Sequence, residues 1–193
     1  MSHIDLVAIG CSTGGPTALL RLLPKLRSLV DTPILITQHG AGIFTDGLAE
    51  QIARVSNSKT LVSKDFDLIQ AGHIYLAPRG HHLTVKRNPT YVTCHLGHGA
   101  AENHFKPSVD PMLRSVAIAY GRKALAVILT GMGKDGLEGC KAIVAHGGRV
   151  LVQDEFTSAV WGMPGAVSHA GIATAKVPLP LMAEAIHRLH RTR

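Results

Sequence analysis

Short apolar runs alternate with helical patterns along most of the chain, and this alternation restricts the possible folds more than any other feature. Residues 6–10 have the continuous apolar character of a buried strand, and apolar residues then recur at helical spacing over 18–26. The same order returns with a strand at 33–38 and a helix at 47–55. Such alternation is typical of a parallel sheet covered by helices, so we predict an α/β fold with a doubly wound, mainly parallel sheet.

The middle of the chain departs from this rhythm. Strand-like residues 74–77 and 83–86 flank a turn that contains His81 and His82, and residues 91–96 follow with alternating character. We predict a small antiparallel hairpin insertion here. The other predicted elements are a short strand at 60–62, a helix at 110–120, strands at 124–130 and 149–153, and helices at 135–145, 164–170 and 179–189.

The length and composition favour one domain that spans residues 1–193. Of the 193 residues, 46% are apolar and 17% are charged, which is enough for one sizeable core. The longest apolar run, at 124–129, is too short to span a membrane, and the amino terminus lacks the zones of a signal peptide. Cys11, Cys94 and Cys140 form no CxxC pair, which argues against a disulfide framework or a zinc site. We therefore expect a cytoplasmic protein without membrane insertion.

The net charge of +7 favours acidic partners through long-range attraction. Nucleic acid is not expected among them, because the charges are dispersed, aromatic residues make up only 4% of the chain, and no nucleic-acid-binding module is recognisable.

The sequence GCSTG at residues 10–14 has the G-x-S-x-G pattern of a nucleophile turn between a strand and a helix. Glycines on both sides of Ser12 permit a sharp turn, and the start of the helix offers free N–H groups to an oxyanion. One alternative is a glycine-rich turn in which Ser12 only caps the helix. A phosphate-binding loop is disfavoured because Pro16 occupies the position of its lysine.

The sequence GMGKDG at residues 131–136 also matches the G-x-G-x-x-G pattern of a dinucleotide site, with Asp154 about 20 residues further on. In such a site Asp135 would lie where the pyrophosphate binds, and the two negative charges would repel each other. Asp135 fits better as a carboxylate at a strand end that orients an imidazole, and capping of the following helix is the alternative.

His39 follows the strand at 33–38 and therefore lies at the same sheet edge as Ser12. An imidazole that titrates near neutrality is the usual base for a serine nucleophile. His169 is the alternative base, since α/β-hydrolases order their triad as serine, acid and histidine, but in that fold strands precede the nucleophile. We expect Cys11 to be a small buried residue. The other histidines have no carboxylate or cysteine that would complete a metal site.

Together these motifs make the sequence similar to the catalytic domain of the chemotaxis protein-glutamate methylesterases, the CheB family, over nearly its whole length. The resemblance rests on six ordered blocks, at residues 9–16, 37–39, 75–81, 107–110, 129–136, and 153–155 together with 162–164.

This resemblance implies a catalytic triad of Ser12, His39 and Asp135, with Thr13 and Met132 supporting the oxyanion through backbone donors. It implies hydrolysis of γ-glutamyl methyl esters on the cytoplasmic helices of methyl-accepting chemotaxis receptors, and some family members also deamidate receptor glutamines. Such helices are rich in glutamate, which fits the positive charge of this chain. No metal and no cofactor are implied.

The sequence departs from the family pattern in two places. After His39 the family usually continues with methionine and proline, whereas this chain has Gly40, Ala41 and Gly42, so the loop beside the base and its fit to substrate are expected to differ. A phosphorylatable receiver domain commonly precedes the catalytic domain, but only five residues precede the first strand here. We expect a stand-alone or shortened esterase, regulated by a separate phosphorylated protein if at all; the alternative is a non-catalytic adaptor that binds receptors.

Overall fold

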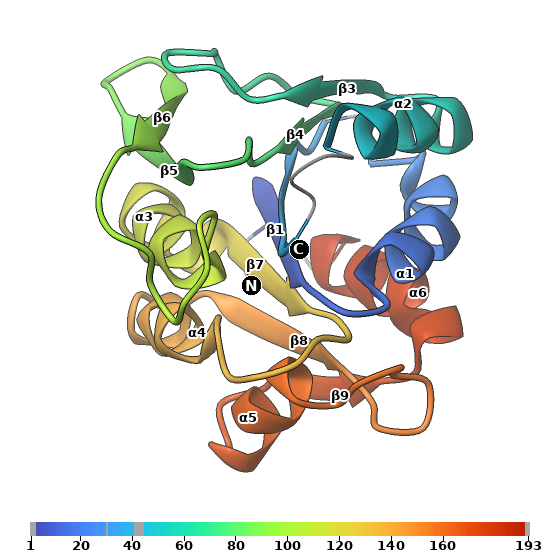
Figure 1. The fold of residues 1–193 in the computed structure, drawn as a ribbon. Coiled ribbons are helices and arrows are strands. Elements are labelled where there is room, and N and C mark those ends of the chain that lie inside the picture. The colour runs from blue at the N-terminus through green and yellow to red at the C-terminus, as the bar shows by residue number, and fades with distance from the viewer. Residues whose placement is uncertain (1–2, 30, 41–44, 192–193) are drawn as a thin grey trace.

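The central sheet holds seven parallel strands in the residues that the computed structural model describes, which are 3–29, 31–40 and 45–191 (Figure 1). The strands are β1 (Leu6–Cys11), β2 (Ile34–Gln38), β3 (Lys59–Val62), β4 (His73–Leu76), β7 (Ala124–Ile128), β8 (Arg149–Gln153) and β9 (Ala175–Val177). Their order across the sheet is β3-β4-β2-β1-β7-β8-β9. The inner strands β1, β2 and β7 are buried along their whole length, as expected for strands covered on both faces.

Helices cover both faces of this sheet (Figure 1). One face carries α1 (Gly15–Leu22), the short 3-10 helix η1 (Leu23–Leu26), α2 (Thr45–Ser56) and α6 (Leu179–Arg191). The other face carries α3 (Val109–Tyr120), α4 (Leu137–Ala145) and α5 (Met163–His169), and the short 3-10 helix η2 (Gly121–Lys123) follows α3. Each face buries its own apolar cluster against the sheet, which confirms the predicted doubly wound α/β class.

The antiparallel insertion is present, but its boundaries differ from the prediction. It consists of β5 (His82–Arg87) and β6 (Val92–Gly97), which pair with each other beside α3. Residues 74–77 were expected in this insertion, yet β4 lies in the parallel sheet between β2 and β3, where Ile74, Tyr75 and Leu76 are all buried. His82 consequently begins a strand and is buried, instead of lying in a turn.

Two further differences concern short or capped segments. The strand β9 was not predicted, because two of its three residues are exposed and it lacks an apolar pattern. The helix expected from Asp135 begins at Leu137, since Gly136 adopts a left-handed conformation with φ 94° and separates Asp135 from the helix.

The strand order creates one point at which the chain changes direction across the sheet. The connection after β1 leads to α1 on one face, whereas the connection after the neighbouring β7 leads to α4 on the other face. Ligand sites of open α/β sheets lie beyond the carboxyl ends of the strands at such a point. Ser12 and Asp135 follow these two strands, and His39 follows β2, the other neighbour of β1.

Candidate active site

The turn that carries Ser12 is held by its neighbours on both sides. The Ser12 N–H donates to the Thr130 carbonyl at 3.0 Å, and the Ser12 carbonyl accepts from the Gly15 N–H at 2.8 Å. Gly14 has φ 79°, a conformation that residues with a Cβ rarely adopt, and a Cβ there would lie 2.7 Å from the Cβ of Ala159. The glycines of the G-x-S-x-G pattern therefore permit a tight junction between β1 and α1.

Gln38 joins the serine turn to the histidine, a role that the sequence analysis missed. Its amide nitrogen donates to the carbonyls of Ser12 at 3.0 Å and of His39 at 2.6 Å, and its amide oxygen accepts from the Cys11 thiol at 3.0 Å. Burial raises the pKa of Cys11 well above its usual range, so this thiol stays protonated. The prediction that Cys11 is a small buried residue is confirmed.

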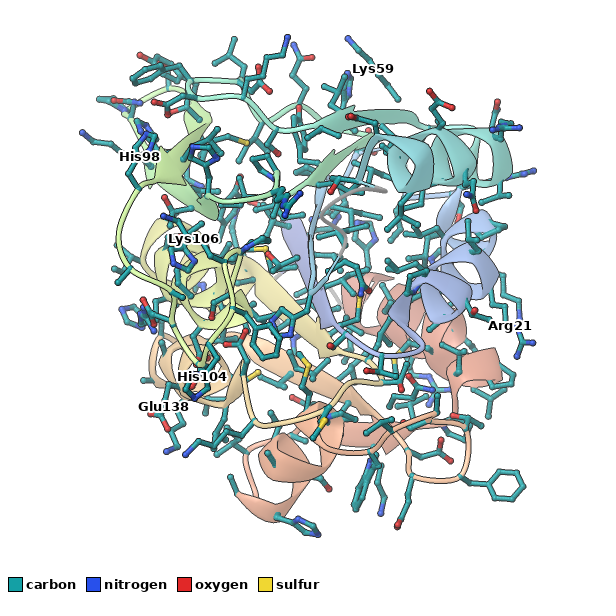
Figure 2. The ribbon with its side chains drawn as sticks, viewed as in Figure 1. Arg21, Lys59, His98, His104, Lys106 and Glu138 are labelled. Atoms are coloured by element: carbon teal, nitrogen blue, oxygen red, sulfur yellow. The ribbon has the colours of Figure 1, made fainter. Side chains whose placement is uncertain are left out.

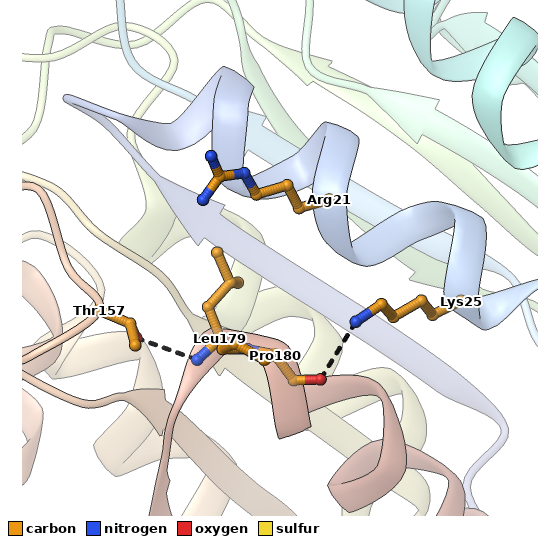
Figure 3. A pocket seen from close by; sticks show the side chains of 5 residues that line it. All are labelled: Arg21, Lys25, Thr157, Leu179 and Pro180. Atoms are coloured by element: carbon orange, nitrogen blue, oxygen red, sulfur yellow. Dashed lines mark hydrogen bonds between the residues drawn. The ribbon is translucent and has the colours of Figure 1, made fainter.

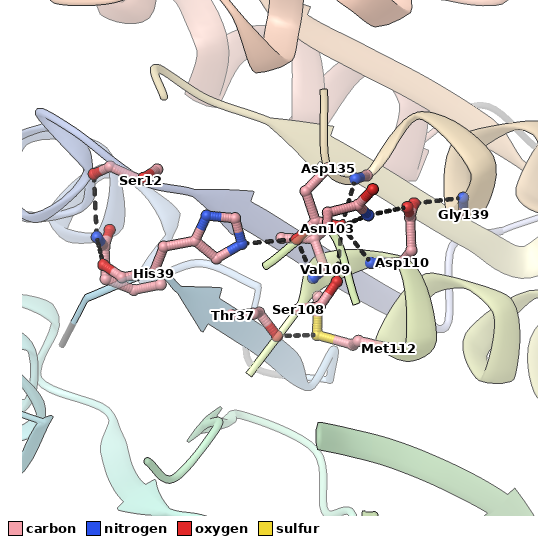
Figure 4. Close-up of polar contacts among 12 residues, drawn as sticks. Ser12, Thr37, His39, Asn103, Ser108, Val109, Asp110, Met112, Asp135 and Gly139 are labelled. Atoms are coloured by element: carbon pink, nitrogen blue, oxygen red, sulfur yellow. Dashed lines mark hydrogen bonds and ion pairs between the residues drawn. The ribbon is translucent and has the colours of Figure 1, made fainter. Parts of the chain in front are cut away.

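His39 and Asp135 form a buried pair. The Nε2 atom of His39 lies 2.6 Å from Oδ2 of Asp135, and both side chains are almost fully inaccessible to water. Figure 4 shows the imidazole of His39 between Ser12 and Asp135. The other ring nitrogen, Nδ1, is buried and has no hydrogen-bond partner among the described residues. Because an ionised Asp135 can only accept, Nε2 carries a proton, and in the neutral imidazole Nδ1 then has the free lone pair.

Asp135 stays ionised because donors surround its carboxylate. Besides His39, it accepts hydrogen bonds from the hydroxyl of Ser108 and from the N–H groups of Val109, Asp110 and Gly136. Burial by itself raises the pKa of Asp135, but these hydrogen bonds, led by the one from His39, outweigh it and lower the pKa to about 2. Most of these donors come from the start of α3, so Asp135 does far more than cap the helix that follows it.

A second buried carboxylate lies beside this pair and was not predicted as part of the site. Asp110 accepts from the Gly139 N–H at 2.7 Å and from the side-chain amide of Asn103 at 2.8 Å. The same Asn103 amide nitrogen donates to Asp135 at 2.9 Å. Burial, together with the negative charge of Asp135, raises the pKa of Asp110. Asp110 lies in one of the six sequence blocks, but no local pattern around Asn103 indicated a role.

This arrangement of a serine turn, a buried histidine and an ionised aspartate at one sheet edge agrees with the comparisons to known proteins. The family model described as CheB methylesterase matches residues 7–186. The chain belongs to the CheB methylesterase family.

Relatives in this family support the assignment. The chain is 48% identical over 186 residues to the protein-glutamate methylesterase/protein-glutamine glutaminase 1 of Paramagnetospirillum magneticum, covering 96% of this chain and 49% of that protein. It is 48% identical to the protein-glutamate methylesterase/protein-glutamine glutaminase of Azospirillum brasilense, covering 91% of this chain and 45% of that protein. The chain thus spans about half the length of the curated relatives it matches.

The fold agrees with that of a solved structure from the CheB family. The crystal structure of the Thermotoga maritima CheB methylesterase catalytic domain superimposes with a TM-score of 0.93 at 35% identity, covering 98% of this chain and 100% of that one.

The two residues expected to support the oxyanion of a CheB-type site lie at its exposed side. Thr13 is exposed, and Met132 is 70% exposed. Among the described residues, the N–H groups of Thr13 and Met132 make no hydrogen bond, whereas the Ser12 N–H is already bound to Thr130. The altered loop after His39 falls mostly on residues 41–44, which lie outside the described part of the chain.

Other candidates lie away from Ser12, His39 and Asp135. The ring of His169 packs edge-on against Trp161, at 5.2 Å between ring centroids, and among the described residues it makes no hydrogen bond with Ser12 or Asp135. A cavity of about 340 Å³ lies between α1 and the start of α6, lined by Arg21, Lys25, Thr157, Leu179 and Pro180 (Figure 3). The described residues that line this cavity include no cysteine, histidine or carboxylate.

Two further features are absent from the described residues. No group of three or more His, Cys, Asp or Glu side chains there is placed to hold a metal ion. No helix in that part of the chain combines the length and apolar character needed to cross a bilayer.

Proposed function

We propose that the chain is the catalytic domain of a serine esterase that hydrolyses glutamyl 5-O-methyl esters on the cytoplasmic helices of methyl-accepting chemotaxis receptors. The observation that carries this proposal is the buried Nδ1 atom of His39, which has no hydrogen-bond partner among the described residues while Nε2 is bound to Asp135, so that the neutral ring has its lone pair on Nδ1. A lone pair held beside a serine turn is suited to take the proton of the Ser12 hydroxyl.

The reaction is then an acyl transfer in two steps. His39 takes the Ser12 proton at Nδ1, Oγ of Ser12 attacks the ester carbonyl, and methanol leaves with the proton from His39. Water next attacks the acyl-serine with His39 again as base, and glutamate is released. Asp135 holds the imidazole in the tautomer with a proton on Nε2 and stabilises the imidazolium that forms in each step. The two ring nitrogens have exchanged the roles they hold in the chymotrypsin-type triad.

Backbone donors at Thr13 and Met132 would stabilise the oxyanion in this mechanism. The N–H groups of both residues make no other hydrogen bond in the described part of the chain, and both residues lie at the exposed side of the site. Preorganised donors of this kind are worth about 10²–10³ in rate when one is removed. No step of the proposed reaction calls for a metal or a cofactor.

The same site is proposed to deamidate receptor glutamines as well. Both relatives carry the name protein-glutamine glutaminase beside protein-glutamate methylesterase. An amide passes through the same acyl-serine, with ammonia leaving in place of methanol, so no additional residue is required.

We propose the receptors as partners of this protein. Because their methylated helices lie in the cytoplasm, we propose the cytoplasm as its location. Control by a separate phosphorylated regulator belongs to the same proposal, with no role for nucleic acid. No observation favours the alternative of a non-catalytic adaptor, and the buried pair of His39 and Asp135 has no evident purpose in one.

Methanol release from methylated receptor cytoplasmic fragments tests the proposal. Wild-type protein should release methanol above the buffer rate, Ser12→Ala and His39→Ala should not, and His169→Ala should retain release. Release by Ser12→Ala at the wild-type rate would exclude Ser12 as the nucleophile, and no release by wild type would overturn the proposed activity of this chain.

A further inference from the structure

A tight turn between β6 and α3 reaches the catalytic pair from outside the parallel sheet. Glu102 and Phe105 exchange two backbone hydrogen bonds, of 3.1 and 2.9 Å, which closes a four-residue turn. Its two central residues, Asn103 and His104, have φ values of 52° and 68°. Positive φ values at both central positions are typical of a type I′ turn.

The turn is fixed in place despite a conformation that residues with side chains disfavour. The carboxylate of Glu102 accepts from the guanidinium of Arg114 on α3 at 2.7 and 2.8 Å. Left-handed residues other than glycine persist only where surrounding contacts hold them, and they occur preferentially at functional sites. The side chains of this turn are therefore expected to contact a functional site.

The side chain of Asn103 joins the two buried carboxylates. Its single amide nitrogen donates one hydrogen to Asp110 at 2.8 Å and the other to Asp135 at 2.9 Å (Figure 4). A neutral group with two donors suits this place, because two negative charges in the protein interior repel each other strongly. Asn103 thus fixes the carboxylate to which His39 is bound.

Phe105 covers the imidazole of His39. The two rings are stacked face to face, with 3.7 Å between their centroids and 10° between their planes. Asp135 holds one edge of the imidazole through Nε2, and the stacked ring restrains rotation of the imidazole out of its plane. These two contacts together define where the lone pair on Nδ1 points.

We propose that the turn Glu102–Phe105 is a positioning clamp for the catalytic base, in which Phe105 fixes the plane of the His39 imidazole and Asn103 fixes the carboxylate of Asp135. The consequences for rate rest on the proposed function, whereas the clamp itself can be tested without substrate. Neither side chain takes part in a bond-making step, so both are positioning residues. Loss of either should lower kcat and leave KM for the methylated receptor fragment nearly unchanged.

Variants at Phe105 provide the first test. Phe105→Leu removes the ring and keeps apolar bulk, and we expect kcat to fall by about tenfold to a hundredfold, as misplacement of a catalytic group does. Phe105→Tyr keeps the ring and should restore most of the rate. Phe66→Leu is the matched control, because Phe66 likewise packs against a histidine ring, that of His95, in a groove whose described lining residues include none of Ser12, His39 and Asp135.

Variants at Asn103 provide the second test. Asn103→Asp keeps the size of the side chain but replaces a double donor by a third carboxylate, so kcat should fall by at least tenfold. Asn57→Asp is the matched control, since Asn57 is left-handed with φ 54° and exposed at the end of α2. Both control variants should keep wild-type kcat and KM.

Nuclear magnetic resonance of His39 in the same proteins separates failure of the clamp from failure of the proposed function. A stacked ring shifts the His39 ring-carbon protons upfield, and this shift should be present in wild type and Phe105→Tyr but absent in Phe105→Leu. The clamp is overturned if the shift is absent in wild type, if Phe105→Leu keeps kcat within twofold, or if KM alone rises. If wild type shows the shift but releases no methanol, the clamp stands and the proposed function fails.

Discussion

Asp110 and Asp135 lie side by side in the protein interior, yet their surroundings shift their pKa values in opposite directions. Asp135 receives hydrogen bonds from His39, Ser108 and two backbone groups of α3, which more than offset burial and lower its pKa to about 2. Asp110 has fewer donors and faces the charge of Asp135, so its pKa is raised. The first carboxylate can orient an imidazole at any physiological pH, whereas the second ionises less readily than an ordinary aspartate.

The variant Asp135→Asn should be almost inactive while remaining folded. An amide has only one accepting oxygen, and an NH2 group that faces His39 favours the tautomer with the proton on Nδ1, so kcat should fall by about 10⁴-fold. Methanol release under saturating substrate measures this, with unfolding in urea as the check on folding. An Asp135→Asn protein that keeps more than a tenth of the wild-type kcat would contradict the role proposed for Asp135.

The variant Asp110→Asn should change how stability depends on pH. A carboxyl whose folded-state pKa is raised stabilises the fold fully below its unfolded pKa of about 4, and this contribution is lost as pH rises through the folded-state pKa. The free energy of unfolding of Asp110→Asn, taken relative to wild type, should therefore increase from pH 4 to pH 7. Urea unfolding of both proteins at the two pH values measures the difference, and a constant difference would show that Asp110 keeps an ordinary pKa.

At the scale of elements, the serine turn depends on the loop after β7 approaching it closely. Gly131 lies in that loop, and a Cβ there would stand 2.4 Å from the sulfur of Met163 and 2.8 Å from the Cβ of Ser12. Both contacts are much shorter than van der Waals distance, so an added methyl group has to displace either the serine turn or the start of α5. The spacing between these elements is therefore part of the site.

The substitution Gly131→Ala should lower kcat strongly and lower the free energy of unfolding only moderately. Overpacking of this kind costs about 1–3 kcal/mol of stability, and displacement of Ser12 should lower kcat by about 10²-fold. Gly47→Ala in α2 is the control, because nothing lies within 4 Å of a Cβ there and the substitution should keep kcat and increase stability by about 0.5–1 kcal/mol. If Gly131→Ala keeps the wild-type kcat, the close packing at Gly131 does not fix the position of Ser12, and this prediction is wrong.

The sequence predicted an element best where burial is uniform along the whole element. Strands such as β1 and β7 are buried on both faces and so consist of unbroken apolar residues, and the residues after them could be placed at one sheet edge. The strand β4 was misplaced because its partners, β2 and β3, are set by tertiary packing and not by its own pattern. Asn103, Phe105 and Gln38 were missed for the same reason, since their partners are distant in sequence or come from turns.

At the scale of the whole molecule, the net charge of +7 gives the protein a field that should attract acidic chains. Part of this charge lies next to the site. Lys106 follows Phe105, whose ring stacks on His39, and its Nζ donates to the carbonyl of His98 (Figure 2). Lys59 is exposed and begins β3, so it lies at the opposite, amino-terminal edge of the sheet.

Hydrolysis of a methylated receptor fragment should therefore weaken with salt, and Lys106 should contribute more than Lys59. Between about 0.02 M and 0.3 M salt the Debye length shortens from roughly 20 Å to 6 Å, so kcat/KM should fall by about tenfold for an acidic fragment and stay constant for a small neutral ester. Lys106→Glu should lower kcat/KM for the fragment by about threefold to tenfold at low salt and flatten its salt dependence. Lys59→Glu makes the same change in net charge at the far edge, so equal effects of the two variants would mean that the overall field, and not the charge beside His39, attracts the substrate.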